Sequence, residues 1–380
     1  MKNFRTGVIG TGFIGVAHVE ALRRLGFVDV VAIAAPNSAK EKAEAMGISH
    51  YFTDYREMID TMALDVVHIC TPNNTHYEMA IYALQQGVNV VCEKPLSCTV
   101  EEAKEMLEVA NKNDLVHAVN FHNRFYPMTY EIKEMIKTGT IGNIFTIHGG
   151  YIQDWLLYDT DYNWRLQSKE SGKTRAVSDI GSHWMDLVQF VTGTKIIEVF
   201  AEFKTVHPVR KMPMKPVEAF AKTKFREEDY KDFNIDTEDF AAILLRFSNG
   251  AVGSVVVSQV FAGKKNKMNL FIAGSKKSVE WDADDHSNLI IGNREKANEV
   301  LTKDPSIVSN TTRGIISYPG GHSEGFPDAF KQNFRQIYNY ISDRSKPKEF
   351  ANFEDGLYQM IVNQSIYESA KLGKWIKIYY

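Results

Sequence analysis

The chain has 380 residues, 44% of them hydrophobic and 24% charged, which is enough for two domains that each bury a sizeable interior. Its 44 Lys and Arg against 47 Asp and Glu give a formal net charge of -3, so the composition offers no basic footprint for nucleic acid. No apolar run reaches the roughly 18 residues of a membrane span, and no apolar signal region precedes the first expected strand. We therefore expect a cytoplasmic protein with a small-molecule ligand and with no nucleic-acid or membrane partner.

Residues 10–15, Gly10-Thr11-Gly12-Phe13-Ile14-Gly15, form a Gly-x-Gly-x-x-Gly turn between an expected strand over 6–9 and an expected helix that Gly26 closes. In such a turn the first glycine permits the tight bend, the second lets backbone approach a pyrophosphate, and the third lets the helix pack on the strand. The helix N-terminus favours the anion. Because both flanking elements are present, we favour a dinucleotide site over a purely structural turn.

The first third of the chain continues as alternating strands and helices. Ser38 and Glu41, and likewise Thr99 and Glu102, have the spacing of a capping box at a helix start, and Gly47 is expected to end the first of these helices. Further strands are expected over 28–34, 65–70, 88–92 and 115–119. This alternation predicts a doubly wound parallel sheet, a Rossmann dinucleotide-binding domain over residues 1–122.

Beyond residue 122 longer extended stretches predominate. Asn249-Gly250 lies between two apolar runs and predicts a hairpin. Strands are expected over 141–148, 196–203, 240–247, 251–257, 267–273 and 278–281. Residues 123–380 are therefore expected to form an α+β substrate-binding and oligomerisation domain with a large, mostly antiparallel, open sheet.

Two helices, one from Pro327 onward and one over 355–372, are expected to cover one face of that sheet. The other face would then pair with a second copy of the chain, in a homodimer or homotetramer. The segment 207–236, rich in Lys, Pro and Glu, is interpreted as a surface loop with partial helix.

The three cysteines, Cys70, Cys92 and Cys98, include no C-x-x-C pair and fit a reduced compartment. The eleven histidines show no H-x-x-x-H or similar ligand spacing, so no metal site is expected.

Two segments carry side chains suited to proton chemistry. Glu93-Lys94-Pro95 follows an expected parallel strand at its carboxyl end, where open α/β sheets bind ligands, although a solvated loop lysine is an equal alternative. Asp179 and His183 are four residues apart, and on a helix they would face the same way. His183 is then a suitable proton acceptor, and Asp179 would orient it or bind the same substrate. The alternative is a helix cap beside a core histidine.

Taken together, four motifs resemble the Gfo/Idh/MocA family of oxidoreductases. They are the glycine turn, Thr71-Pro72-Asn73-Asn74-Thr75-His76, Glu93-Lys94-Pro95 and Asp179-Ile180-Gly181-Ser182-His183, in that order over nearly the whole chain. The resemblance implies an NAD(P)-dependent dehydrogenase acting on a hydroxyl or keto carbon of a sugar, inositol or related polyol. It implies Lys94, Asp179 and His183 as catalytic residues, with His183 as acid and base and Lys94 stabilising the substrate oxygen. The expected cofactor-binding residues are Gly10, Gly12, Phe13, Ile14, Gly15, Asn37, Ser38, Thr71, Pro72, Asn73, His76, Glu93 and Lys94.

Other side chains are expected at the substrate. Arg124 and Asn120 follow the last parallel strand, and Trp164-Arg165 offers an aromatic face beside a guanidinium, which suits a sugar ring, although inter-domain packing is the alternative for this pair. His322 lies in a glycine-rich loop that the resemblance places near substrate.

The sequence leaves the nucleotide and the net reaction open. Where NAD-binding folds carry an Asp or Glu after the second strand, this chain has Ala34-Ala35-Pro36-Asn37-Ser38, which favours NAD over NADP only slightly. A nicotinamide-binding regulator without net catalysis, and a hydrolase or epimerase that oxidises its substrate transiently, remain alternatives.

Overall fold

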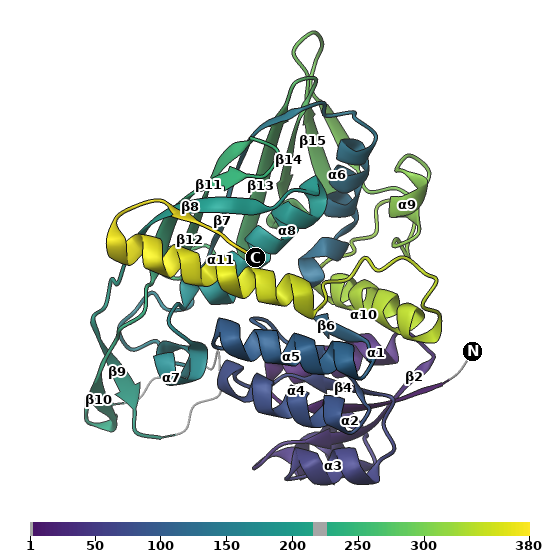
Figure 1. Ribbon diagram of the computed structural model, residues 1–380, viewed down its shortest axis with the longest axis vertical. Coiled ribbons are helices and arrows are strands. Elements are labelled where there is room, and N and C mark those ends of the chain that lie inside the picture. The colour runs from purple at the N-terminus through teal and green to yellow at the C-terminus, as the bar shows by residue number, and fades with distance from the viewer. Residues whose placement is uncertain (1–2, 216–225) are drawn as a thin grey trace. The chain divides into compact units, whose positions relative to one another are not determined.

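The computed structural model describes residues 3–215 and 226–380, which divide into two compact units (Figure 1). One unit runs up to His122 and takes in Lys169–Gly172 and Pro327–Met360. The other contains Asn123–Ser168, Lys173–Phe326 and Ile361–Tyr380. Each unit thus combines segments that are distant in sequence, whereas the domains 1–122 and 123–380 are continuous and remain a prediction.

The first unit is built on a six-stranded parallel sheet in the order β3-β2-β1-β4-β5-β6. This order, with the first strand at the centre, is that of a Rossmann fold and confirms the predicted architecture. The strands are β1 Phe4–Ile9, β2 Val28–Ala34, β3 His50–Phe52, β4 Val66–Ile69, β5 Asn89–Cys92 and β6 His117–Val119. The helices between them are α1 Phe13–Arg23, α2 Ala39–Met46, α3 Tyr55–Thr61, α4 His76–Gln85 and α5 Val100–Lys112.

The two predicted helix caps have different outcomes. At α5 the Thr99 hydroxyl accepts from the backbone N–H of Glu102, whose carboxylate accepts in return from the Thr99 N–H, so that capping box is confirmed. At α2 the box is wrong, because Ser38 is the N-cap residue but its side chain makes no capping bond. The Ser38 hydroxyl instead pairs with that of Thr11 at 2.8 Å. A long-range partner has displaced the local one.

Helix α10 (Phe326–Ser342) corrects a second expectation. From Pro327 onward it belongs to the first unit rather than covering the sheet of the second. Its Phe334 and Tyr338 are fully buried, with Phe334 against the ring of His68 and Tyr338 against that of Phe4. The apolar stripe of α10 therefore packs on residues of β1 and β4. Helix α11 (Phe353–Leu372) is divided, with residues 353–360 in the first unit and 361–372 in the second.

The second unit contains a nine-stranded open sheet in the order β16-β15-β14-β13-β7-β12-β11-β8-β17. All its neighbouring strands are antiparallel except β7 and β12, so the prediction of a large, mostly antiparallel sheet is confirmed. Gly250, with a φ of +86°, forms the predicted turn between β11 and β12. The strands are β7 Ile144–Ile152, β8 Ile196–Lys204, β11 Phe240–Phe247, β12 Val252–Ser258, β13 Lys267–Gly274, β14 Ser278–Asp282, β15 Asn288–Gly292, β16 Glu299–Thr302 and β17 Ile376–Lys377.

Helix α8 (Ser182–Thr192) lies against one face of this sheet (Figure 1). The indole N–H of its Trp184 donates to the carbonyl of Asn269 on β13 at 2.8 Å. Gly149 on β7 makes room for that ring, since a Cβ there would lie 2.4 Å from the indole nitrogen. The remaining helices of this unit are α6 Pro127–Lys137 and α9 Asn310–Arg313.

The segment 207–236 differs from the predicted loop with partial helix. Its described parts form a two-stranded antiparallel sheet, β9 Val209–Pro213 with β10 Tyr230–Asn234, and one 3₁₀ turn over Glu227–Asp229. Residues 216–225 lie outside the described residues. Short helix α7 spans Ser168–Ser171.

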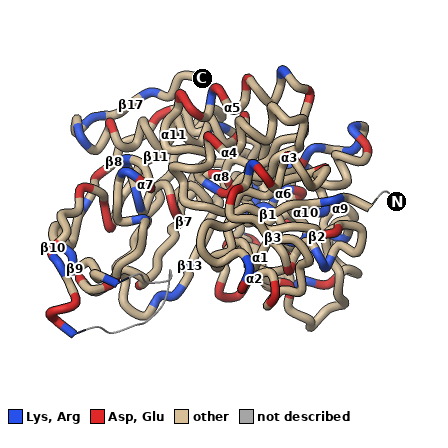
Figure 2. The backbone as a smooth tube through the Cα atoms, turned by 90° about the horizontal axis from the view of Figure 1, so that it is seen from below, with Lys and Arg blue, Asp and Glu red and all other residues tan. Residues whose placement is uncertain are grey.

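Charges of both signs are interspersed along the elements of each unit (Figure 2). Among the described residues, no helix is long and apolar enough to span a bilayer. A search of residues 3–215 and 226–380 for groups of three or more His, Cys, Asp or Glu in metal-binding proximity finds none.

Candidate active site

The glycine turn has the geometry expected for a phosphate cradle. Gly10 has a φ of +94°, and a Cβ there would lie 2.6 Å from the carbonyl oxygen of Cys70, so the tight bend requires glycine. A Cβ on Gly15 would lie 2.0 Å from the Gly10 carbonyl oxygen, which explains the close approach of α1 to the turn. Gly12 caps α1 with its Cβ direction open, because nothing lies within 4 Å. Backbone N–H groups at this end are accessible to an anion, so the turn fits a dinucleotide.

The residues beside the turn are either exposed or held by a hydrogen bond. Phe13 opens α1 with 56% of its surface exposed, and Ile14 beside it is half-buried. The Thr11–Ser38 hydrogen bond ties the turn to the residues that follow β2. Asn37 is exposed there, and no Asp or Glu occurs between Ala34 and Ser38.

The loop after β4 contacts the loop after β5. His76 is fully buried, and its two ring nitrogens lie 2.9 Å from the carbonyl oxygens of Thr71 and Pro95. Burial lowers the pKa of His76 below its usual value. Asn73 donates from its side chain to the carbonyl of Ser171 at 3.1 Å. His76 therefore brings two of the predicted motifs together at the carboxyl edge of the sheet.

Glu93 and Lys94 follow β5 directly, and the Lys94–Pro95 peptide bond is cis. The Glu93 carboxylate is buried and accepts from the ring of His18 at 2.9 Å and from the amide of Asn120 at 2.5 Å. Burial opposes its ionisation, but His18, the charge of Lys94 and the Asn120 amide together lower the pKa of Glu93 to about 2. An anionic Glu93 thus directly precedes Lys94 and accepts from its backbone N–H at 3.2 Å.

In the second unit Asp179 is held from two sides. One carboxylate oxygen accepts from Arg165 Nε at 3.0 Å and the other from the Gln259 amide at 3.0 Å. The Arg165 guanidinium also lies 4.5 Å from the ring centroid of Trp164, a cation–π contact. Three predicted site residues, Asp179, Arg165 and Trp164, are therefore adjacent in the structure.

The local conformation at Asp179 was not foreseen. Residues Val177–Gly181 form one π-helical turn, and the α-helix proper begins at Ser182 rather than at Ser178. Single π turns are frequent at functional sites because they displace side chains from regular helical spacing. His183, on the first turn of α8, is 5% exposed, and its ring centroid lies 6.2 Å from that of Tyr151.

Arg124 and His322 have structural partners of their own. Two nitrogen atoms of Arg124 donate to the two carboxylate oxygens of Asp186, at 2.8 and 2.5 Å, and its guanidinium lies 4.9 Å from the ring centroid of Phe190. Arg124 thereby fixes the turn before α6 to α8. His322 is exposed, on a loop whose carbonyl oxygens surround the buried ammonium of Lys303. Glu324 pairs with the same ammonium at 2.9 Å, so the loop has a rigid base.

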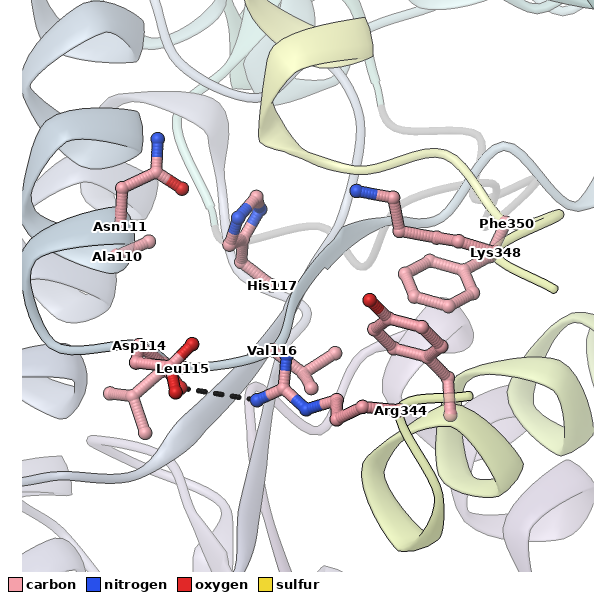
Figure 3. A pocket seen from close by; sticks show the side chains of 10 residues that line it. Ala110, Asn111, Asp114, Leu115, Val116, His117, Arg344, Lys348 and Phe350 are labelled. Atoms are coloured by element: carbon pink, nitrogen blue, oxygen red, sulfur yellow. Dashed lines mark hydrogen bonds between the residues drawn. The ribbon is translucent and has the colours of Figure 1, made fainter. Parts of the chain in front are cut away.

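A cavity of about 140 Å³ opens elsewhere in the first unit (Figure 3). His117, Arg344 and Lys348 line it at the amino end of β6, the edge of the sheet opposite to the glycine turn. Helices α5 and α10 both end there, and helix C-termini attract cations. Arg344 donates to the carbonyl of Asp114 at 3.1 Å, as Figure 3 shows. We therefore explain these cations by the helix ends and do not count the cavity as part of the candidate site.

Several residues that hold the predicted ones were not predicted from the sequence. His68 gives a signal, because a histidine inside the buried run Val66–Ile69 requires a polar partner. Gln259 and Arg175 give no comparable local signal. Arg175 is fully buried, donates to Asp239 at 2.5 Å, and approaches the Gln259 side-chain oxygen at 3.4 Å.

Two family models match the chain. The model described as "Oxidoreductase family, NAD-binding Rossmann fold" matches residues 4–121, and the "GFO/IDH/MocA C-terminal domain" matches residues 129–280.

Relatives by sequence include levoglucosan dehydrogenase of Pseudarthrobacter phenanthrenivorans, 33% identical over 74% of this chain and 74% of its own length. Myo-inositol 2-dehydrogenase of Thermotoga maritima is 28% identical over 73% of this chain and 75% of its own length. A solved structure of levoglucosan dehydrogenase in complex with NADH and L-sorbose superposes with a TM-score of 0.88 at 27% identity and covers 100% of both chains. An oxidoreductase domain protein from Kribbella flavida superposes with a TM-score of 0.90 at 27% identity, again over 100% of both chains. The chain therefore belongs to the GFO/IDH/MocA family and is an NAD-binding oxidoreductase of the dehydrogenase type.

Proposed function

We propose that this enzyme oxidises a hydroxyl carbon of a sugar, inositol or related polyol, or reduces the corresponding ketone, with Lys94, Asp179 and His183 as catalytic residues. The observation that carries the proposal is the adjacency of motif residues within each unit. The open Gly12 turn and the anchored Glu93–Lys94 pair follow strands of one sheet at its carboxyl edge. Asp179 is oriented by Arg165 and Gln259 in the other unit. Relatives named for levoglucosan and myo-inositol support the substrate class.

The chemistry follows from what each side chain can hold. A bound nicotinamide dinucleotide supplies the hydride acceptor in oxidation. His183 accepts the hydroxyl proton, a general-base contribution of roughly 10²- to 10⁴-fold. The Lys94 ammonium stabilises the negative charge that develops on the substrate oxygen. Reduction uses the same groups in reverse, with His183 returning the proton.

For the cofactor we propose NAD rather than NADP. A dehydrogenase of similar fold binds NADH, and the exposed Asn37 after β2 is suited to ribose hydroxyls. Lys40 and Lys42 follow closely in sequence and would favour a 2′-phosphate, so the preference is small. Dissociation constants for the two reduced cofactors, measured by their fluorescence on binding, decide between them. Tighter binding of NADPH would contradict the proposal.

Trp164, Arg165 and His322 are proposed to contact the substrate. The indole face and the guanidinium of the first two suit the ring and the hydroxyls of a sugar. Arg124 stays a prediction as a substrate residue, and its bidentate pair with Asp186 already accounts for its burial.

The test is a panel of sugars, inositols and sugar acids incubated with the full chain and NAD, with absorbance at the reduced-nicotinamide band as readout. A dehydrogenase accumulates reduced cofactor in proportion to product. Product without reduced cofactor would indicate transient oxidation, and neither would indicate a regulator. His183→Ala should abolish turnover and leave NADH affinity within about threefold, since the cofactor residues lie in the other unit. Near-normal turnover in that variant would overturn the assignment of His183.

The oligomeric assembly and the cellular location are proposed as well. We propose a homodimer or homotetramer formed through the open face of the nine-stranded sheet, where large apolar side chains are exposed. The cytoplasmic location stays a prediction of the sequence.

A further inference from the structure

A line of buried hydrogen bonds runs beneath the nucleotide turn of the first unit. It begins at Thr6 on β1, whose hydroxyl pairs with that of Tyr338 at 2.8 Å. The Tyr338 hydroxyl lies 3.0 Å from His68 Nε2, and His68 Nδ1 lies 2.8 Å from His18 Nδ1. His18 Nε2 reaches Glu93 Oε1 at 2.9 Å. The first four residues of the line are fully buried, with 0% exposure, so water does not compete for these bonds.

The donors of the hydrogen bonds in this line can be assigned from the atoms in contact. Glu93 is ionised, as its low pKa indicates, and a carboxylate only accepts hydrogen bonds. His18 Nε2 therefore carries the proton in their contact, and the Asn120 amide nitrogen, which lies 3.2 Å from the same Nε2, donates to Glu93 instead. The two Nδ1 atoms face each other, so one of them carries a proton and the other accepts it. The ring of His18 is consequently fixed at both nitrogens, whichever of the two histidines donates.

Packing fixes the same ring in space. His18 lies edge-on to His68, with centroids 5.0 Å apart, and its ring centroid is 4.7 Å from that of Phe334 and 5.6 Å from that of Phe330. Both phenylalanines belong to α10. Ring packing and the contacts of both ring nitrogens thus constrain the orientation of the imidazole, with Nε2 directed at Glu93.

Glu93 connects the ring of His18 to the backbone of Lys94. Its second carboxylate oxygen accepts from the backbone N–H of Lys94 at 3.2 Å. Asn120 donates to Oε1 at 2.5 Å and is itself held by the Asn333 amide, which donates to the Asn120 side-chain oxygen at 2.8 Å. Glu93 Oε1 is thus held by His18 of α1 and by Asn120 after β6, and Asn333 of α10 supports Asn120 in turn.

We propose that His18 is a positioning residue for Lys94, acting through Glu93, and that α10 supplies the anchors that hold His18. The inference rests on the proposed function, because it assigns Lys94 its place in catalysis. Without the His18 donor the Glu93 carboxylate turns or draws in water, and the Lys94 backbone loses its fixed position. Displacement of a reacting group by about 1 Å costs on the order of 100-fold in rate.

The experiment compares two substitutions of His18 in the full chain. His18→Phe keeps the ring shape and removes both nitrogens, whereas His18→Gln keeps an N–H at the Nε2 position. We expect His18→Phe to lower kcat about 10- to 100-fold while KM changes less than about threefold. His18→Gln should restore kcat to within about threefold of wild type. A role confined to folding would instead lower stability in both variants and leave kcat per folded molecule unchanged.

A second pair of variants tests the anchor in α10. Tyr338→Phe removes the hydroxyl that His68 Nε2 contacts and should lower kcat about two- to fivefold. The matched control is Tyr340→Phe on the same helix, which should leave kcat unchanged. Equal kcat values in the two variants would contradict the role of α10.

A spectroscopic readout is independent of activity. Nitrogen NMR of histidine-labelled protein, with His18→Gln for assignment, should show a proton on His18 Nε2 at neutral pH. An unprotonated His18 Nε2 would overturn the inference. Wild-type kcat in His18→Phe would also overturn it, provided that Lys94→Met abolishes turnover. If Lys94→Met itself keeps full activity, the proposed function fails, and the NMR result still stands as evidence on the His18–Glu93 bond.

Discussion

Gly12 and Gly15 belong to one motif but are glycine for different reasons. At Gly15 a Cβ would collide with the backbone of Gly10, whereas at Gly12 it would meet nothing in the protein and the φ of -71° suits any residue. The requirement for glycine at position 15 therefore comes from folding, whereas we expect the requirement at position 12 to come from a ligand.

Alanine substitutions should separate these requirements. Gly15→Ala should destabilise the protein by about 3 kcal/mol, because backbone must move to admit the methyl group. Gly12→Ala should leave the free energy of unfolding within about 0.5 kcal/mol but weaken NADH binding about tenfold or more. Denaturant unfolding and fluorescence titration of both variants check this. Unchanged NADH affinity in Gly12→Ala would argue against a pyrophosphate at the turn.

His117 makes stability depend on pH. Burial, Lys348 and Arg344 lower its pKa to about 4, opposed by Asp355, and its Nδ1 accepts the backbone N–H of Phe353 at 3.0 Å. Since the folded pKa lies below the unfolded value, the stabilisation is complete above about pH 6.5 and is lost as pH falls toward 4.

Between pH 8 and pH 5 this linkage amounts to about 2 kcal/mol. We expect His117→Asn to be less stable than wild type at pH 8 but to lose about 2 kcal/mol less on acidification. Urea unfolding at the two pH values measures the difference. Parallel losses in both proteins would mean that the pKa of His117 is the same in the folded and unfolded states.

At the scale of elements, α10 shows that an amphipathic helix can be predicted from sequence although the surface on which it packs cannot. The sequence predicted a helix from Pro327 and assigned it to the wrong sheet, because a stripe of Phe330, Phe334 and Tyr338 fits any apolar surface. Its actual partners include Phe4, His18 and His68, more than 260 residues earlier in the chain.

Phe334→Ala tests the corrected placement. Loss of this fully buried ring should cost about 3–5 kcal/mol. Hydrogen exchange should accelerate in β1 and β4, whose residues it supports, and should stay unchanged in the β11–β12 hairpin of the other unit. Faster exchange in the hairpin alone would instead indicate that α10 packs on the nine-stranded sheet.

At the scale of the whole molecule, one face of the nine-stranded sheet exposes large apolar side chains. Register aligns one row of side chains across eight strands, and its exposed apolar members include Leu244, Phe271, Ile290 and Val300. Apolar side chains in such a row favour association with a second copy.

We expect Leu244→Glu combined with Phe271→Glu to reduce the assembly to monomers in light scattering, because charges would be buried without partners. Lys267, at a half-buried position of β13, pairs with Asp282. Lys267→Glu would break this ion pair and is therefore not a suitable control. Lys112→Glu, at the end of α5 in the first unit, serves instead and should leave the assembly intact. A wild-type protein that is monomeric at micromolar concentration would contradict the proposed oligomer.

The order of four motifs along the chain determined the family. The sequence by itself also determined the glycine turn, the Asn249–Gly250 hairpin and many of the strands and helices. Each of these depends on residues close together in the chain, where periodicity and turn chemistry act. It also identified Lys94, Asp179 and His183 as candidates from motif order.

Only the tertiary structure decided what holds those candidates. The Ser38 hydroxyl took a partner 27 residues away in place of its local cap, Asp179 lies in a π turn between Arg165 and Gln259, and α10 packs on the first sheet. The His18–Glu93 bond joins residues 75 positions apart, and His68 meets Tyr338 across 270. Buried polar groups must find partners wherever the fold brings them, and local sequence carries no record of a partner so distant.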